Sequence, residues 1–187
     1  GEEAYSLAIL VDEALENSQK KIRVKIFTTD INQNALEKAA IGIYPATIVK
    51  HVNPERLEKY FVSKKNSFQV TRKLRDMLIF AYHDLTTDVG FTRINLITCR
   101  NLLIYMQPEL QRKVLQNLHF SLKTQGILFL GDSEHLGSLE DEFVSINKKH
   151  KIYHKRRDVS LHIPVISIDK SDKISNFAIS NIPNYSK

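Results

Sequence analysis

Short apolar runs of strand length alternate along this chain with segments whose apolar residues recur at helical spacing. Residues 3–17 have the helical pattern, and residues 23–28 are typical of a strand. The remaining expected helices cover residues 34–40 and 108–122, and the remaining expected strands cover residues 77–81, 94–98, 127–130, 143–146 and 151–155. Strands that alternate with helices indicate an α/β fold, with a largely parallel sheet covered on both faces. The last two strands can pair as a hairpin.

Two regions depart from this alternation. Residues 42–76 hold short apolar stretches around the polar Ser63-Lys64-Lys65-Asn66, which favours a small antiparallel insertion. Residues 158–187 are rich in Ser, Asn, Ile and Lys and have no clear period. We therefore expect one catalytic domain over residues 1–157, followed by a linker or tail over residues 158–187.

Charge alone does not identify a partner. The 187 residues hold 27 Lys and Arg against 21 Asp and Glu, a net charge of +6. Basic residues at 148–151 and 155–157 flank the apolar Ile152-Tyr153, a pattern typical of a strand near a sheet edge. Nucleic-acid binding is the alternative, but too few aromatic residues are interleaved there to favour it.

The single cysteine, Cys99, excludes an internal disulfide and favours a reducing compartment, so we expect a cytoplasmic protein. Its place at the end of an apolar strand predicts a small buried residue and not a nucleophile. The seven histidines form no Cys/His cluster, so no metal site is expected. No apolar run approaches the roughly 20 residues that cross a membrane, so no membrane insertion is expected.

The strongest candidate for a functional site follows the expected strand at residues 94–98. That strand ends in Cys99-Arg100-Asn101, after which the chain becomes apolar again and closes with Tyr105. Ligands of open α/β sheets bind just beyond the carboxyl ends of the strands, so Arg100 and Asn101 are placed for chemistry. The alternative is that Arg100 caps a neighbouring helix and Asn101 makes the turn.

Several motifs in a fixed order give this segment a wider context. They are Gly1-Glu2-Glu3-Ala4-Tyr5-Ser6-Leu7-Ala8, Thr29-Asp30-Ile31-Asn32, Gly42-Ile43-Tyr44-Pro45, Phe80-Ala81-Tyr82-His83-Asp84-Leu85, Cys99-Arg100-Asn101 and Gly126-Ile127-Leu128-Phe129-Leu130-Gly131-Asp132-Ser133-Glu134. The set resembles the catalytic domain of CheR, the S-adenosylmethionine-dependent methyltransferase that esterifies glutamates on bacterial chemoreceptors. The segments Pro45-Ala46-Thr47-Ile48 and Asn53-Pro54-Glu55-Arg56-Leu57 resemble the CheR-type domain of CheB–CheR fusion proteins.

The resemblance implies a class I S-adenosylmethionine-dependent methyltransferase fold, which is Rossmann-like, with a β-subdomain inserted at residues 42–76. It also implies a first central strand and a glycine-rich turn immediately before Gly1-Glu2-Glu3. The sequence does not contain them, so we expect an N-terminally truncated catalytic domain. The implied partners are the cytoplasmic domains of chemoreceptors, with fused CheB-like or PAS-type signalling domains as further candidates.

The resemblance also implies a set of cofactor-binding residues: Glu3, Asp30, Asp84, Leu85 and Asn101. Asp30 would accept hydrogen bonds from the ribose hydroxyls, and Glu3 would face the charged methionine portion. Asp84 and Leu85 would lie beside the adenine, where the family more often has Asn at the first position. The alternatives are a helix N-cap for Asp30 and a favourable interaction with the helix dipole for Glu3.

Arg100 and Tyr105 are implied to orient the incoming carboxylate, and S-adenosylhomocysteine would be the product. A glutamate is already ionised at neutral pH, so the reaction needs orientation and desolvation more than a base. One alternative function is a non-catalytic module that binds cofactor or partners within a fusion protein. Another is methylation of a small molecule or nucleic acid, which the Cys-Arg-Asn segment and the insertion disfavour.

Overall fold

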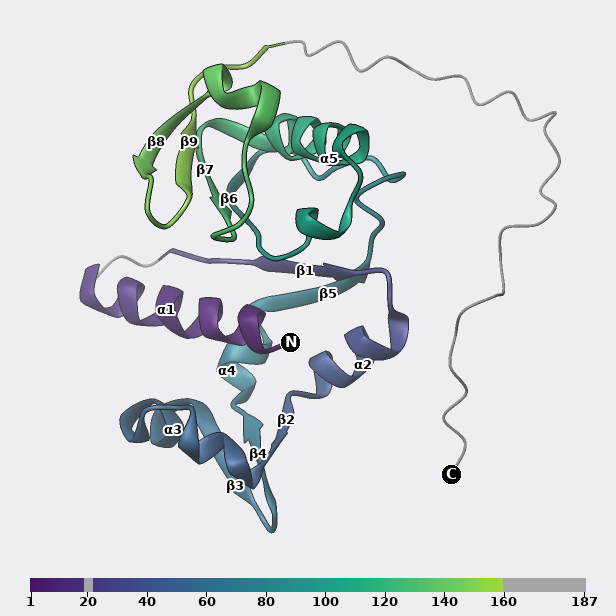
Figure 1. Cartoon of the computed structure of the whole chain (residues 1–187). Helices are drawn as coiled ribbons and strands as arrows, with labels where there is room; N and C mark the ends of the chain where they lie inside the picture. The colour runs from purple at the N-terminus through teal and green to yellow at the C-terminus, as the bar shows by residue number, and fades with distance from the viewer. Residues whose placement is uncertain (19–21, 160–187) are drawn as a thin grey trace, which may run out of the picture.

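The computed structural model describes residues 1–18 and 22–159. The described strands form a parallel pair, a small antiparallel sheet and a four-stranded mixed sheet (Figure 1). The parallel pair is β1 (Ile26–Asp30) with β5 (Leu78–Tyr82), whose register runs from Ile26↔Leu78 to Asp30↔Tyr82. The expected alternation and parallel pairing are confirmed, although the first strand begins three residues later than the sequence pattern indicated.

Helix α1 (Glu2–Ser18) provides the core of this part of the molecule. Its buried face carries Tyr5, Ala8 and Ile9, which pack with Leu74 and Leu78. Helix α2 (Gln33–Ile41) follows β1 and ends at Gly42, which has the left-handed φ of 65° that glycine adopts without strain. Both helices were expected from their spacing, and the structure confirms them within two residues.

The segment after α2 forms the antiparallel sheet in the order β2-β4-β3. Its strands are β2 (Ile43–Pro45), β3 (Phe61–Lys64) and β4 (Ser67–Val70), joined by α3 (Pro54–Tyr60) and followed by α4 (Arg72–Arg75). The expected antiparallel pairing is present. Lys59 and Tyr60 lie in the last turn of α3, and β3 begins at the next residue, Phe61. Tyr60 is 1% exposed and packs against α1.

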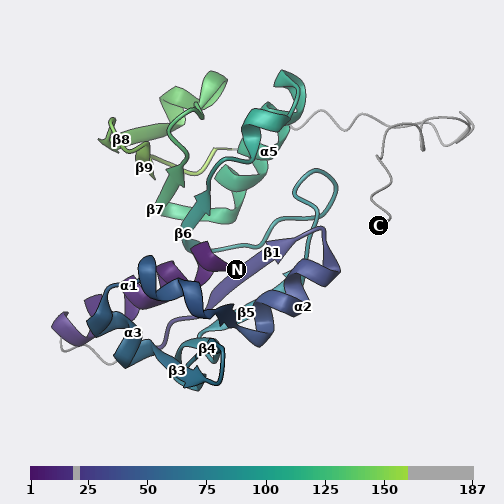
Figure 2. The same ribbon diagram turned by 60° about the horizontal axis from the view of Figure 1, so that its bottom comes forward.

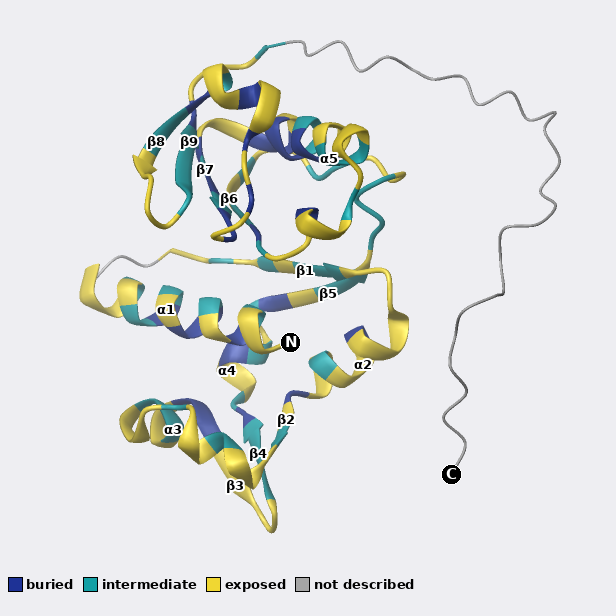
Figure 3. Cartoon of the chain, viewed as in Figure 1, coloured by how far each residue is buried: buried dark blue, intermediate teal, exposed yellow. Residues whose placement is uncertain are grey.

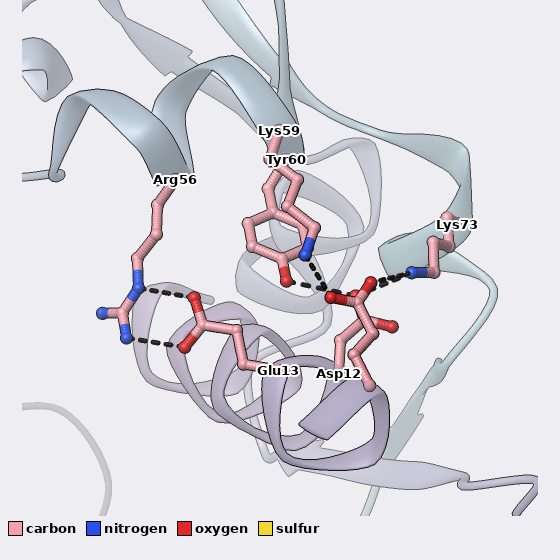
Figure 4. Close-up of polar contacts among 7 residues, drawn as sticks. Asp12, Glu13, Arg56, Lys59, Tyr60 and Lys73 are labelled. Atoms are coloured by element: carbon pink, nitrogen blue, oxygen red, sulfur yellow. Dashed lines mark hydrogen bonds and ion pairs between the residues drawn. The ribbon is translucent and has the colours of Figure 1, made fainter. Parts of the chain in front are cut away.

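A polar network fixes this segment to α1 (Figure 4). The Tyr60 hydroxyl donates to Asp12 Oδ2 at 3.1 Å, and Lys73 Nζ donates to the same oxygen at 2.7 Å. The Asp12 side chain is 8% exposed. Nearby, Arg56 forms a two-pronged pair with Glu13, at 2.8 and 2.7 Å. The inserted segment is therefore held to the first helix by the buried Asp12 carboxylate and by surface ion pairs to Glu13 and Glu16.

We expect Asp12→Ala to lower the free energy of unfolding by about 2–3 kcal/mol, because it leaves the buried Tyr60 hydroxyl without an acceptor. Glu13→Ala should lower it by clearly less, because the Glu13 and Arg56 side chains are 30% and 42% exposed and solvent screens the pair. Urea unfolding of both variants measures the difference. Equal losses would show that burial of Asp12 does not set its contribution.

The mixed sheet has the order β6-β7-β9-β8. Its strands are β6 (Ile94–Cys99), β7 (Leu122–Leu130), β8 (Phe143–Asn147) and β9 (Ile152–Lys155), and α5 (Pro108–Ser121) covers it. β6 and β7 are parallel, and β8 and β9 form the expected antiparallel hairpin. Buried positions gather on α5 and β7 (Figure 3). Contrary to expectation, Gly126 lies inside β7, where the register shifts opposite Ile94 to Leu96.

The edge-strand interpretation of the basic residues is wrong for Lys155. β9 lies between β7 and β8, and Lys155 is 2% exposed. Its ammonium donates to the carbonyl oxygens of His119 at 2.8 Å and Leu122 at 2.7 Å, at the end of α5. A cation there satisfies carbonyl groups that the helix leaves unpaired. The buried Lys155 side chain therefore caps the C-terminal end of α5.

His119 should make stability depend on pH, because burial and the charge of Lys155 lower the pKa of its imidazole. The unfolded chain takes up a proton near pH 6.5, whereas the folded chain resists it, so stability is lost as pH falls below about 6.5. The slope from one such group is at most about 1.4 kcal/mol per pH unit. His119→Phe keeps the ring contact with Phe143 and should reduce this slope in urea unfolding between pH 5 and 8. His150→Gln, at an exposed position, should leave it unchanged.

The parallel pair and the mixed sheet have separate cores and do not share a ladder within the described residues. β1 pairs with β5 on one side, and β6 pairs with β7 on one side. In Figures 1 and 2 the β6 end of the mixed sheet lies toward β1. The other edges of β1 and β6 have no strand partner among the described residues.

Candidate functional site

The carboxyl end of β1 places Asp30 at the surface with part of its carboxylate in use. Asp30 Oδ1 accepts from the backbone N–H of Asn32 at 2.8 Å, and the Asp30 carbonyl accepts from the N–H of His83 at 3.2 Å. Asn32, and not Asp30, is the N-cap of α2, because its side chain accepts from the N–H of Ala35 at 3.0 Å. The helix-cap alternative for Asp30 is therefore wrong. Its second oxygen has no hydrogen-bond partner among the described residues.

The carboxyl end of β5 lies beside that of β1, and there Asp84 closes a turn. Asp84 Oδ1 accepts from the Thr86 hydroxyl at 2.6 Å and from the Thr86 N–H at 2.8 Å. These bonds hold the pKa of the Asp84 carboxyl below its usual value. Leu85 packs against the core of the mixed sheet, and its carbonyl accepts from Asn117 at 3.2 Å. Both residues thus have structural partners, and one Asp84 oxygen is engaged locally.

The carboxyl end of β6 carries Arg100 and Asn101. The Arg100 guanidinium lies over the Phe129 ring, with its carbon 4.8 Å from the ring centroid. Arg100 Nε is buried without a hydrogen-bond partner in the described chain. Asn101 has a left-handed φ of 56°, which Asn tolerates better than most residues. The turn interpretation of Asn101 is confirmed, and Arg100 stacks on a ring of β7 in place of capping a helix.

Cys99 is 5% exposed, as expected for a buried packing residue. Burial, followed by the negative charges of Glu134 and Glu3, raises the pKa of its thiol to about 12. The thiol therefore stays protonated at neutral pH and is a poor nucleophile. Glu3 itself is exposed.

The Tyr105 side chain has no described contact with Arg100. Tyr105 ends the short 3-10 helix η2 (Leu103–Tyr105) and is 82% exposed. Within residues 1–18 and 22–159, no hydrogen bond joins Tyr105 to Arg100. The structure thus brings Arg100 and Asn101 into one turn and leaves the Tyr105 side chain in solvent.

Glu134 and Gly131 make close contacts at the ends of β6 and β7 that the sequence alone did not indicate. Glu134 is 2% exposed and accepts from backbone N–H groups on both sides of the β6–β7 strand ends. At Gly131 an added Cβ would stand 2.5 Å from Asn101 Oδ1 and 2.8 Å from Glu134 Oε2, so a larger residue does not fit. The sequence signal was the Gly131-Asp132-Ser133-Glu134 segment after a strand, which is equally compatible with an ordinary turn.

These groups suit a ligand that has both hydroxyl donors and a carboxylate. Asp30 offers a free carboxylate oxygen to hydroxyls, and Arg100 offers an unpaired buried N–H to an anion. Arg100 Nε, like Arg75 Nε, is a buried donor without an acceptor in the described chain, so it can donate to a ligand. No group of three or more His, Cys, Asp or Glu side chains in the described part of the chain could hold a metal ion.

Comparison with known proteins identifies the family. The model of the SAM-binding domain of CheR methyltransferase matches residues 1–152. The chain belongs to the CheR methyltransferase family. The resemblance seen in the motifs is thereby confirmed, as is S-adenosylmethionine as the cofactor for which this domain is built.

Several relatives carry related sequences. An uncharacterized 104.1 kDa protein of Rhodobacter capsulatus is 38% identical over 157 residues, which are 84% of this chain and 16% of that protein. A chemotaxis protein methyltransferase of Listeria innocua is 35% identical over 136 residues, 73% of this chain and 50% of that protein. A chemotaxis protein methyltransferase of Escherichia coli K12 is 31% identical over 156 residues, 76% of this chain and 51% of that protein. The chain thus spans about half the length of these chemotaxis methyltransferases.

None of its described helices is long and apolar enough to cross a membrane.

Proposed function

We propose that the protein transfers a methyl group from S-adenosylmethionine to glutamate side chains in the cytoplasmic domains of chemoreceptors, giving glutamate methyl esters. The observation that carries this proposal is Arg100, whose buried Nε lacks a partner at the end of β6 in a CheR-family domain. A guanidinium with an unused donor is suited to a carboxylate. We place the reaction in the cytoplasm, where a lone reduced cysteine is stable.

Residues at the strand ends would hold the cofactor, which supplies an electrophilic methyl group on a sulfonium. The free oxygen of Asp30 would accept from the ribose hydroxyls, and Glu3 would face the positive charge. The second oxygen of Asp84 would accept from the adenine amine, while Leu85 packs beside the ring. Asn101, fixed in its left-handed turn, would contribute polar groups between cofactor and acceptor.

The acceptor glutamate needs orientation more than activation. Its carboxylate is ionised at neutral pH, so no general base has to remove a proton. Arg100 would fix the carboxylate through charge-assisted hydrogen bonds, and the Phe129 ring holds the guanidinium in place. Tyr105 would contribute from the exposed end of η2, once the acceptor covers it. Orientation of this kind removes part of the barrier without any change in bonding.

A second function is kept because related sequence occurs in a much larger protein. The matched region is 16% of the 104.1 kDa Rhodobacter protein. In such a setting the domain could bind cofactor or partners without turnover, beside CheB-like or PAS-type signalling domains. Retention of Asp30, Arg100, Asn101 and Tyr105 favours catalysis over this alternative.

The deciding experiment is transfer of labelled methyl from S-adenosylmethionine to purified chemoreceptor cytoplasmic fragments. We expect label on the receptor that mild alkali releases as methanol, because a glutamate methyl ester is base-labile. A receptor fragment with its acceptor glutamates replaced by alanine is the control. Cofactor binding without transfer to any fragment would favour the non-catalytic module, and alkali-stable label would place the methyl group on another kind of acceptor.

A further inference from the structure

The Glu134 carboxylate is shared between two strand ends. Its Oε1 accepts from the backbone N–H groups of Leu102 and Leu103, both at 2.8 Å, and its Oε2 accepts from that of Gly131 at 2.6 Å. The residue is 2% exposed. A carboxylate that gives up water for three main-chain donors makes short, charge-assisted bonds, which fix the geometry of the groups that donate them.

These bonds continue the β6–β7 pairing beyond its last ladder pair. That pair is Cys99 with Leu130, where the regular ladder ends. Glu134 then joins Leu102 and Leu103, on the β6 side, to Gly131, on the β7 side. Its own N–H donates to the Gly131 carbonyl at 3.0 Å, so the β7 side is closed as a turn.

Arg100 and Asn101 lie inside the loop that these bonds close. Asn101 takes the left-handed conformation, a strained one for a residue with a side chain, which persists when its surroundings hold it. Gly131 leaves room for it, since a Cβ there would stand 2.5 Å from Asn101 Oδ1 and 2.9 Å from Asn101 N. The direction in which Arg100 leaves the chain therefore depends on the Glu134 carboxylate.

We propose that Glu134 is a positioning residue for the methyl-transfer reaction, which holds the Arg100-Asn101 turn in the conformation that receives the acceptor carboxylate. It acts through the main chain of Leu102, Leu103 and Gly131 and touches neither substrate nor cofactor. This inference rests on the proposed function. The inference goes beyond that function because it assigns the placement of Arg100 to a buried carboxylate on the neighbouring strand end.

A double-mutant cycle in the complete protein tests this assignment. Glu134→Gln keeps the size of the side chain, but its amide turns a donor toward one of the three N–H groups. We expect it to lower kcat for methyl transfer at least tenfold alone, but less than twofold in the Arg100→Ala background, because groups that act as a unit are not additive. An equal loss in both backgrounds, or no loss in either, would overturn the proposal.

Two controls separate positioning from stability. Asp132→Asn changes an exposed acid in the same turn and should leave kcat unchanged. Leu139→Ala removes a 3% exposed side chain from the adjacent core, so it should lower Tm while kcat below the transition is retained. If Leu139→Ala lowers kcat as much as Glu134→Gln does, the effect of Glu134 is one of stability and the proposal fails.

Amide resonances provide a readout that does not need turnover. In ¹⁵N-glycine and ¹⁵N-leucine labelled protein, we expect the amide protons of Gly131, Leu102 and Leu103 to resonate downfield, because all three donate to the Glu134 carboxylate. Glu134→Gln should move them together with the signals of Arg100 and Asn101 in uniformly labelled protein. If the wild-type protein transfers no methyl group, the proposed function fails, and these chemical shifts alone decide whether Glu134 holds the Arg100-Asn101 turn. Arg100 and Asn101 signals that do not move in Glu134→Gln would overturn the proposal that Glu134 is a positioning residue.

Discussion

Arg100→Ala in the complete protein is expected to lower methyl transfer at least about 100-fold, with binding of S-adenosylhomocysteine within a few-fold of normal. In the proposed site the substitution would remove two charge-assisted hydrogen bonds to the acceptor carboxylate, each contributing about 1.5–3 kcal/mol. It also removes the stacking on Phe129. Because we propose that Arg100 binds the acceptor and that carboxylates at other strand ends bind the cofactor, the two measurements should separate.

Charge alone should not restore the activity. Arg100→Lys keeps the positive charge but loses the planar fork that matches a carboxylate, so we expect partial recovery at most. Arg112→Ala, at an exposed position on α5, is the matched control and should have no effect. Rates are measured with labelled S-adenosylmethionine, and affinities by calorimetry. Normal transfer by Arg100→Ala would remove the residue from the proposed site, and equal losses in transfer and affinity would assign it to the cofactor.

Asp30→Asn is expected to weaken binding of S-adenosylhomocysteine at least about tenfold, measured by calorimetry in the complete protein. Asn keeps an oxygen that can accept from the Asn32 N–H, so the turn after β1 is retained. It replaces the free carboxylate oxygen with an amide NH2 group, which donates and cannot accept from a ribose hydroxyl. The loss of a hydrogen bond to a charged group is about 1.5–3 kcal/mol, which is tenfold or more in affinity.

The control for Asp30 lies two residues away. Asn32→Ala removes the N-cap of α2 and should cost about 1 kcal/mol of stability while leaving affinity near normal. An unchanged affinity in Asp30→Asn would show that the carboxylate serves the turn alone. A loss of affinity in Asn32→Ala as large as that in Asp30→Asn would show that the conformation of the turn, and not the charge, determines binding.

Much of the fold followed from local pattern. Apolar residues at helical spacing predicted α1, α2 and α5, and short apolar runs predicted β5, β6 and the β8–β9 hairpin. The boundaries were less certain where the backbone departs from regular geometry. The expected strand over residues 127–130 was too short, since β7 begins at Leu122 and runs through Gly126. The register shift against β6 accommodates the irregular Gln125, which has a φ of 65°.

The sequence by itself determined which residue types stand at the strand ends and which family they belong to, because strand and helix periods and short motifs are local properties of the chain. The tertiary structure decided how those residues are used. It buried Lys155 at the end of α5 and left Arg100 Nε without a hydrogen-bond partner among the described residues. It also joined Glu134 to Leu102, 32 positions earlier. Whether a polar group is free or engaged depends on neighbours brought by folding from distant segments, and no local pattern encodes that.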